Sequence, residues 1–260
     1  MSARCRRPSI KYNFCPTTDK NYADLFSSRF CRKGCARYRR RKSNRTRRRP
    51  AISFHGAYVI VGFADGDGGT ESVLNELKTL GTLANAVKSD ITTVAGAANL
   101  IAEVEKMFGR IDLLVNCLKF QSDSEFEETM EDAFEKTIDQ NLKSAFFVTQ
   151  AAFPLMKTRP KLEIVNVVSA IDTPETKLDA VFAALQNALI GLTKSLAKSL
   201  PKKFRVNVVA VSEKKTVSEN LDAELFRPTT NVSADDATRT IVYLLSAEAV
   251  GLNGQILTIE

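Results

Sequence analysis

The chain has 260 residues, of which 44% are hydrophobic, and this suits one soluble α/β domain with a sizeable core. No stretch approaches the roughly 20 consecutive apolar residues of a membrane helix, so we expect no membrane-spanning segment. The net charge of +7 is unevenly spread, because residues 1–50 hold 17 of the 37 Lys and Arg but only two of the 30 acids. These residues, the basic arm, therefore carry +15, and residues 51–260, the body, carry −8.

The basic arm also holds four of the five cysteines, at positions 5, 15, 31 and 35. The intervening stretches of 9, 15 and 3 residues include a single short one. Zinc sites typically show paired short spacings, so we expect no metal. The composition favours a solvated, poorly ordered arm.

The composition of the arm is compatible with more than one cellular compartment and with more than one binding partner. Arginine clusters interleaved with tyrosines keep RNA as an alternative partner. An Arg-rich, acid-poor start also fits a mitochondrial or plastid transit peptide, and the default compartment is otherwise the cytoplasm.

The body alternates predicted strands and helices along its whole length. Short β-branched runs predict buried strands, and apolar residues at helical spacing predict helices. We expect strands at 57–63, 82–90, 110–117, 162–170, 205–211 and 254–260, with helices between them at 70–81, 97–109, 131–157, 179–200 and 235–246. Strict alternation predicts a parallel sheet with helices on both faces.

Several segments of the body match one family in the same order. They are "GRIDLLVNC" (109–117), "NALIGLTKSLAKSL" (187–200) with "RVNVVAV" (205–211), and "GLNGQILTIE" (251–260). Through them the body resembles the short-chain dehydrogenase/reductases. The resemblance implies a Rossmann-like parallel sheet flanked by helices on both faces, oxidoreductase chemistry on a small alcohol or ketone, and NAD or NADP as cofactor.

The family uses a Tyr as proton donor, a Lys that lowers the pKa of this phenol, a Ser that orients the substrate carbonyl, and an Asn that positions a water. The resemblance places Asn141 and Ser169 at the Asn and Ser positions. Phe182 stands at the Tyr position and Gln186 at the Lys position. A phenyl ring has no proton to transfer, and a neutral amide cannot depress a phenol's pKa. Loss of a general acid costs about 10²–10⁴ in rate, so we expect little or no catalysis.

The resemblance also implies cofactor contacts. It places Asp90 beside the adenine, Asn116 at the first Asn of the family's Asn-Asn-Ala-Gly turn, and Thr216 at the nicotinamide carboxamide. The acidic residue that holds the adenosine ribose of NAD is replaced by Phe63, and Asp65 lies two residues too late. We therefore expect impaired cofactor binding.

The glycine loop that holds a pyrophosphate at a helix N-terminus has no counterpart. Counting back from Gly56 places it near residues 38–47, which read "YRRRKSNRTR". "GFADGDGG" (62–69) offers glycines after a strand, but placing the loop there would omit one strand–helix unit before Asn116. We thus expect the first strand–helix unit to be replaced by the basic arm. "SIKYNF" (9–14) alternates apolar and polar residues, which suits a half-exposed strand better than a buried one.

These patterns predict a short-chain dehydrogenase/reductase-like pseudoenzyme whose remaining role is self-association or partner binding. We expect the helices at 128–157 and 179–200 to pair between subunits, as the resemblance implies. Two alternatives stay open. One is a working NAD(P)-dependent oxidoreductase that uses Ser169 and Asn141 with an unusual acid, and the other is an RNA-binding protein that uses the basic arm.

Overall fold

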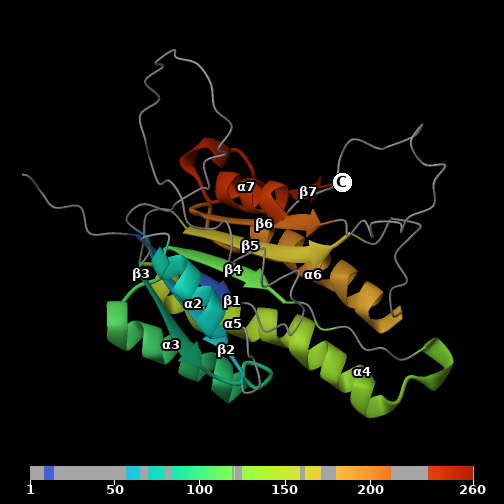
Figure 1. The fold of residues 1–260 in the computed structure, drawn as a ribbon. Coiled ribbons are helices and arrows are strands. Elements are labelled where there is room, and N and C mark those ends of the chain that lie inside the picture. The colour runs from blue at the N-terminus through green and yellow to red at the C-terminus, as the bar shows by residue number, and fades with distance from the viewer. Residues whose placement is uncertain are drawn as a thin grey trace, which may run out of the picture.

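The computed structural model of the protein describes residues 9–14, 57–64, 70–79, 83–118, 120, 125–158, 162–170, 180–211 and 234–259. The strands are β1 (Ser9–Phe14), β2 (Ala57–Phe63), β3 (Leu83–Lys88), β4 (Leu113–Cys117), β5 (Leu162–Ser169), β6 (Phe204–Val211) and β7 (Ile256–Ile259). They form one seven-stranded sheet in the order β3-β2-β1-β4-β5-β6-β7 (Figure 1). Every pair of neighbours is parallel, as the alternation of strands and helices predicted.

Helices cover both faces of the sheet. One face packs against α3 (Val94–Phe108), α5 (Ser144–Met156) and α6 (Ala180–Ser199), and the other packs against α2 (Thr70–Thr79) and α7 (Ala234–Leu244). The helix α4 (Glu131–Ile138) runs through a π-helical turn (Asp139–Lys143) into α5. The predicted Rossmann-like architecture is thus confirmed.

The position of β1 corrects one expectation. Ser9–Phe14 lies between β2 and β4, with Tyr12 beside Ile60 on one side and Leu114 on the other. The basic arm therefore supplies a strand at the central position, where the sequence analysis expected no buried strand, and residues 15–56 lie outside the described part of the chain. Parallel pairing uses backbone groups that any extended segment supplies, so apolar–polar alternation did not exclude a central place.

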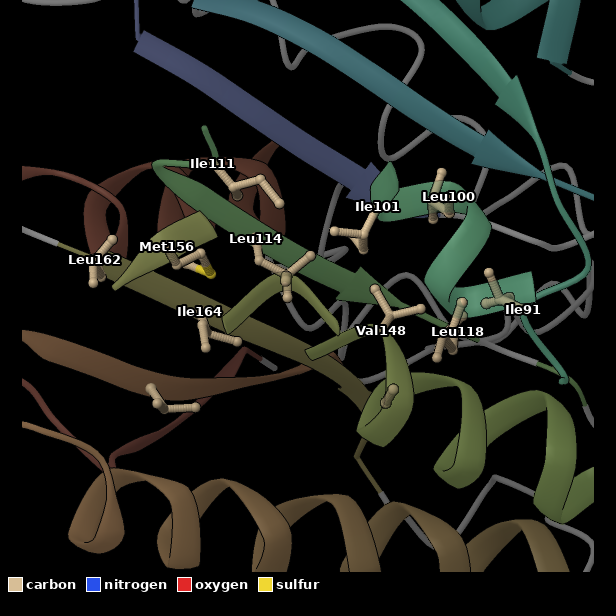
Figure 2. Close-up of a cluster of buried hydrophobic side chains, with 14 of the residues drawn as sticks. Ile91, Leu100, Ile101, Ile111, Leu114, Leu118, Val148, Met156, Leu162 and Ile164 are labelled. Atoms are coloured by element: carbon tan, nitrogen blue, oxygen red, sulfur yellow. The ribbon is translucent and has the colours of Figure 1, made fainter. Parts of the chain in front are cut away.

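The main hydrophobic core lies between the sheet and the layer of α3, α5 and α6 (Figure 2). Leu114 and Ile164 extend from the sheet toward Leu100 of α3 and Val148 of α5, and each of these four is at most 2% exposed. All eight residues of β5 are buried, as expected for a parallel strand covered on both faces. Burial of each such aliphatic side chain contributes about 1.5–3 kcal/mol.

α6 is the one helix in the described part of the chain that is long and apolar enough to cross a membrane. The sequence analysis did not anticipate this. A core helix of a globular domain meets the same criterion. α6 packs on β5 and β6 and buries Leu185, Leu189 and Thr193, which fits the role of a core helix.

A buried ion pair ties α7 to the sheet. Glu163 in β5 and Arg205 in β6 are register partners near the amino ends of their strands, and the guanidinium donates to the carboxylate. It also donates to the carbonyls of Leu244 at 3.0 Å and Ser246 at 2.8 Å, and to that of Ala249. Because α7 ends at Leu244, the cation satisfies carbonyls near the end of this helix.

Arg205→Met should lower the free energy of unfolding by about 3–5 kcal/mol, because Glu163 would stay buried without its cation. Urea denaturation followed by circular dichroism measures the change. Lys106→Met is the control, because the ion pair of Lys106 with Glu103 is exposed and should contribute less than about 1 kcal/mol. Equal losses in the two variants would contradict the role assigned to Arg205.

Candidate functional site

Most of the predicted site residues that the structure describes lie near the carboxyl ends of the strands, where ligands bind in open α/β sheets. Asn116 is the penultimate residue of β4, Ser169 is the last residue of β5, and Asp90 follows β3 by two residues. Thr216 lies outside the described residues. The edge of the sheet thus brings together positions that are far apart in the sequence, as the resemblance implied.

Gln186 contacts Ser169 directly. Its Oε1 accepts the backbone N–H of Ser169 at 2.9 Å, and its side chain is 0% exposed. Leaving a buried N–H without an acceptor costs about 1–3 kcal/mol, so this bond stabilises the end of β5. A lysine has three donors and no acceptor. Gln186 therefore has a structural role that a lysine at the same position cannot fill.

The amide nitrogen of Gln186 makes no comparable hydrogen bond. Its Nε2 is buried and has no hydrogen-bond partner among the described residues. The sequence analysis identified Gln186 only by what it lacks, namely a charge. The bond to Ser169 depends on how α6 is placed against β5, and no sequence pattern indicates it.

Phe182 precedes Gln186 by four residues on α6, so both side chains lie on the same face of the helix. Its ring is 0% exposed and is among the largest fully buried side chains. The position at which the resemblance implied the family's proton donor thus holds a buried hydrocarbon ring.

Asn141 lies in the π-helical turn and is 0% exposed. Its Nδ2 donates to the carbonyls of Phe120 and Thr137, both at 2.8 Å, and its Oδ1 accepts the N–H of Phe120 at 3.1 Å. The amide thus ties the loop after β4 to the helix. Since the π-helical turn also packs against α6, Asn141 lies close to the helix that carries Phe182 and Gln186. Its predicted role in positioning a water stays a prediction.

Asn116 belongs to a buried chain of hydrogen bonds. Its Nδ2 donates to Thr149 Oγ1 at 3.1 Å and to Asn166 Oδ1 at 2.8 Å. The Nδ2 of Asn166 donates to Thr193 Oγ1 at 2.8 Å, and the Thr193 hydroxyl donates to the Leu189 carbonyl at 2.9 Å. This amide chain runs from α5 through β4 and β5 to α6. The sequence analysis missed Asn166 and Thr193, although an Asn inside the apolar run "LEIVNVVSA" signals a buried partner.

Asp90 is exposed at the edge of the sheet. Its Oδ1 accepts from Thr92 Oγ1 at 2.6 Å and from the Thr92 N–H at 3.1 Å, which fixes the orientation of the carboxylate. A Cβ on Gly96 in α3 would lie 1.7 Å from the Asp90 carbonyl oxygen. Glycine is therefore required for this close approach of α3 to the loop that follows β3.

The residues around the predicted ribose position fit a dinucleotide poorly. Phe63, the last residue of β2, is half-buried where the family carries an acidic side chain. Gly62 lies within β2, paired with Phe14 and Val87, so it does not belong to the turn after the first strand, as its spacing predicted. Asp65 lies outside the described residues.

The position of β1 also corrects the expected place of the glycine loop. β1 ends at Phe14, so the sequence that follows the first strand begins with Cys15 rather than near residues 38–47, and residues 15–56 lie outside the described part of the chain. Before Gly56 the chain contains a single glycine, Gly34. Neither placement therefore offers the closely spaced glycines that let backbone N–H groups approach a pyrophosphate.

No group of three or more His, Cys, Asp or Glu that could hold a metal ion occurs in the described part of the chain. Cys117 of β4 is buried. The four cysteines of the basic arm lie outside the described residues, so the expectation of no metal site there stays a prediction.

Asn141→Ala should lower the free energy of unfolding by about 1–3 kcal/mol, because the backbone groups of Phe120 and Thr137 would lose their partner. Urea denaturation measures the difference. Asn187→Ala is the matched control, since Asn187 is exposed and makes one long bond of 3.4 Å, and it should stay within about 0.5 kcal/mol of the wild type. If both alanine variants match the wild type, Asn141 does not hold the loop.

The comparisons with known proteins agree with this fold. A family model described as short chain dehydrogenase matches residues 51–223. A 3-oxoacyl-(acyl-carrier-protein) reductase of Staphylococcus aureus is 29% identical over 218 residues, covering 80% of this chain and 89% of that protein. Among solved structures, a short chain dehydrogenase of Burkholderia cenocepacia in complex with NADP has a TM-score of 0.67 at 24% identity, covering 79% of this chain and 86% of its own. A dehydrogenase/reductase of Sinorhizobium meliloti has a TM-score of 0.74 at 18% identity, covering 96% and 93%. The chain belongs to the short-chain dehydrogenase family.

Proposed function

We propose that this member of an oxidoreductase family has little or no hydride-transfer activity and that its remaining role is binding. The observation that carries the proposal is the buried bond between Gln186 Oε1 and the Ser169 N–H, at 2.9 Å. It gives the residue at the Lys position a structural task that is incompatible with a lysine. The relative in Staphylococcus aureus is a reductase, and the relative in Burkholderia cenocepacia was solved in complex with NADP. Under the proposal, the ancestor of this chain was a reductase that bound a dinucleotide.

Proton transfer is the first missing step. Reduction of a carbonyl needs a donor that gives a proton to the oxygen, and Phe182 has none. Ser169 and Asn141 do not titrate near neutral pH, so neither replaces a phenol whose pKa a cation has lowered. The loss of a general acid costs about 10²–10⁴ in rate.

Cofactor binding is the second missing step. A dinucleotide needs backbone N–H groups at a glycine-lined helix N-terminus, and the chain has a single glycine before Gly56. Phe63 offers no hydrogen bond to a ribose hydroxyl. Since positioning of the two reactants contributes more to catalysis than any single proton transfer, we propose that the cofactor defect dominates.

Phe182→Tyr/Gln186→Lys should not bind NADPH and should not reduce ketones, because the double substitution leaves the cofactor site unchanged. Fluorescence titration with NADPH measures binding, and the short chain dehydrogenase of Burkholderia cenocepacia, solved in complex with NADP, is the positive control. We also expect the double variant to lose about 1–3 kcal/mol of stability, because the Ser169 N–H loses its acceptor.

A chimera separates the two defects. Replacement of residues 1–55 by a glycine-loop strand–helix unit, in the double variant, should restore NADPH binding. If the double variant alone binds NADPH, the phosphate loop is misplaced and "GFADGDGG" (62–69) is the real one. Wild-type oxidation of NADPH with small ketones, abolished by Ser169→Ala, would instead favour the working oxidoreductase. Filter binding of RNA that weakens steeply with salt would favour the RNA-binding alternative.

Self-association through the helices at 128–157 (α4 and α5) and 179–200 (α6) is the binding role we propose. The outward side of α6 carries Ala184 and Gly191, both exposed, and a Cβ on Gly191 would meet nothing within 4 Å. On α5, Phe146 is 40% exposed. Small residues let a second helix approach closely, and an exposed aromatic ring gains stability when a partner covers it.

Ala184→Arg should convert a dimer into a monomer, because a long cation would separate the facing helices. Size-exclusion chromatography with light scattering measures the mass. Ala98→Arg is the matched control, since Ala98 is equally exposed on α3 and lies outside the proposed pair of helices. A monomeric wild type, or dissociation by both substitutions alike, would contradict the pairing.

A further inference from the structure

The loop that leads into β7 contains the one Asn-Gly pair of the chain, Asn253–Gly254. In such a pair the backbone can attack the preceding side chain, because glycine has no Cβ to obstruct the approach. The Gly254 nitrogen then bonds to Asn253 Cγ, and its proton passes to the side-chain nitrogen, which leaves as ammonia. Water opens the resulting succinimide ring to aspartate or isoaspartate. The net reaction, deamidation, needs no reactant other than water.

In the folded protein, each group that takes part in this reaction is held by a hydrogen bond. The Gly254 N–H donates to the Val206 carbonyl at 2.8 Å. Asn253 Oδ1 accepts the Val206 N–H at 2.9 Å, and Asn253 Nδ2 donates to the Ala197 carbonyl at 3.0 Å. The side chain thus connects the loop to β6 and to the last turn of α6. Attack requires the amide to turn toward the Gly254 nitrogen, so these bonds must break first.

A second asparagine holds the same loop from within β6. Asn207 Nδ2 donates to the Leu252 carbonyl at 3.0 Å, and Asn207 Oδ1 accepts the Gln255 N–H at 3.0 Å. Asn207 is 1% exposed, so these bonds form largely out of water, where each is stronger. The residues on both sides of the Asn-Gly pair are therefore fastened to the sheet.

The fold itself requires glycine at the reactive position. Gly254 has a φ of +72°, a backbone conformation that residues with a side chain rarely adopt. A Cβ there would also lie 3.2 Å from the Ala197 Cβ, which is a tight contact. The docked loop thus depends on the same residue that makes Asn253 reactive when the loop opens.

We propose that Asn253–Gly254 is a deamidation site that is unreactive while the loop is docked on β6 and α6, and that its conversion releases β7. Aspartate has no N–H for the Ala197 carbonyl and places an anion beside the end of α6, where the helix dipole disfavours negative charge. Isoaspartate adds one backbone carbon, which displaces Gln255 from Asn207. β7 is an edge strand that pairs with β6 alone, so the loss of this loop weakens its attachment.

Release of β7 would reach the core. Leu257 and Ile259 of β7 pack against the buried cluster that contains Val209 and Val211 of β6, and this cluster would lose part of its cover. The inference goes beyond the proposed function, since it concerns the chemical lifetime of the sheet whether or not the chain transfers hydride.

The rate of deamidation in the full-length wild type, followed by peptide mass spectrometry at mildly alkaline pH, tests the protection. The folded protein should react at least roughly tenfold more slowly than the same protein in concentrated urea, because only the open loop can cyclise. Exchange of the Gly254 N–H with solvent should show protection of the same size, since the same opening exposes it. Equal rates in the folded and unfolded protein overturn the proposal, as does an Asn253 that stays intact in urea.

Variants outside the reactive pair test the role of the docked loop. Asn207→Ala should react roughly tenfold faster than the wild type, when each rate is divided by that of the same protein in urea. Asn187→Ala, on the exposed side of α6, is the control and should react at the wild-type rate. Circular dichroism shows whether each variant is folded. If Asn207→Ala does not fold, Gln255→Pro removes one of the same bonds at an exposed position. No acceleration in a folded variant overturns the proposal.

A third comparison tests the effect of the product. Asn253→Asp should raise hydrogen exchange across Ile256–Ile259 roughly tenfold, because the loop before β7 opens more often. Asn187→Asp makes the same chemical change at an exposed side chain and should leave this exchange unchanged. Wild-type protein that has deamidated, separated from the rest by ion exchange, should behave as Asn253→Asp does. Exchange that matches the unmodified wild type in both would show that deamidation does not release β7.

Discussion

The amide chain from Thr149 through Asn116 and Asn166 to Thr193 sets the positions of β4, β5 and the helices on one face of the sheet. Each buried amide must find a partner, because an unpaired polar group costs more inside a protein than in water. A shift of either strand by one residue would turn these amides toward the opposite face, so the chain also fixes the register. The ends of β4 and β5 at the carboxyl edge of the sheet, where Asn116 and Ser169 lie, depend on this constraint.

Two amide side chains of the candidate site, those of Asn141 and Gln186, also hold backbone segments in place. Asn141 fastens the loop that follows β4, and Gln186 fastens the end of β5. In both residues the side-chain amide oxygen accepts a hydrogen bond from a backbone N–H group. In this chain, structural hydrogen bonds and the buried ring of Phe182 occupy positions at which the resemblance implied catalytic side chains. Under the proposed function, the three-layer scaffold is retained while the chemistry at its carboxyl edge has changed.

Most of the body could be predicted because the inner strands β4, β5 and β6 are buried on both faces and the helices are buried on one. The run at 57–63 became β2 without a change of boundary, and the helix expected at 179–200 begins at Ala180. β1 was predicted as a half-exposed strand, because neither its pattern nor the arginine-rich sequence that follows indicates a central place. The hydrogen bond between Gln186 and Ser169 could not be predicted, because it depends on the orientation of α6 relative to β5, and the two residues are seventeen positions apart in the sequence.

The central place of β1 has a consequence for the order in which the chain folds. Lys11 pairs with Val59 of β2 and with Leu113 of β4, so the first strand finds its first partner 48 residues later and waits 102 residues for its second. Contacts between such distant residues form slowly, because the loop between them must close first. During synthesis at about 5–20 residues per second, this wait lasts roughly 5–20 seconds. For that time β1 has a partner strand on one side at most and cannot take its central place in the sheet.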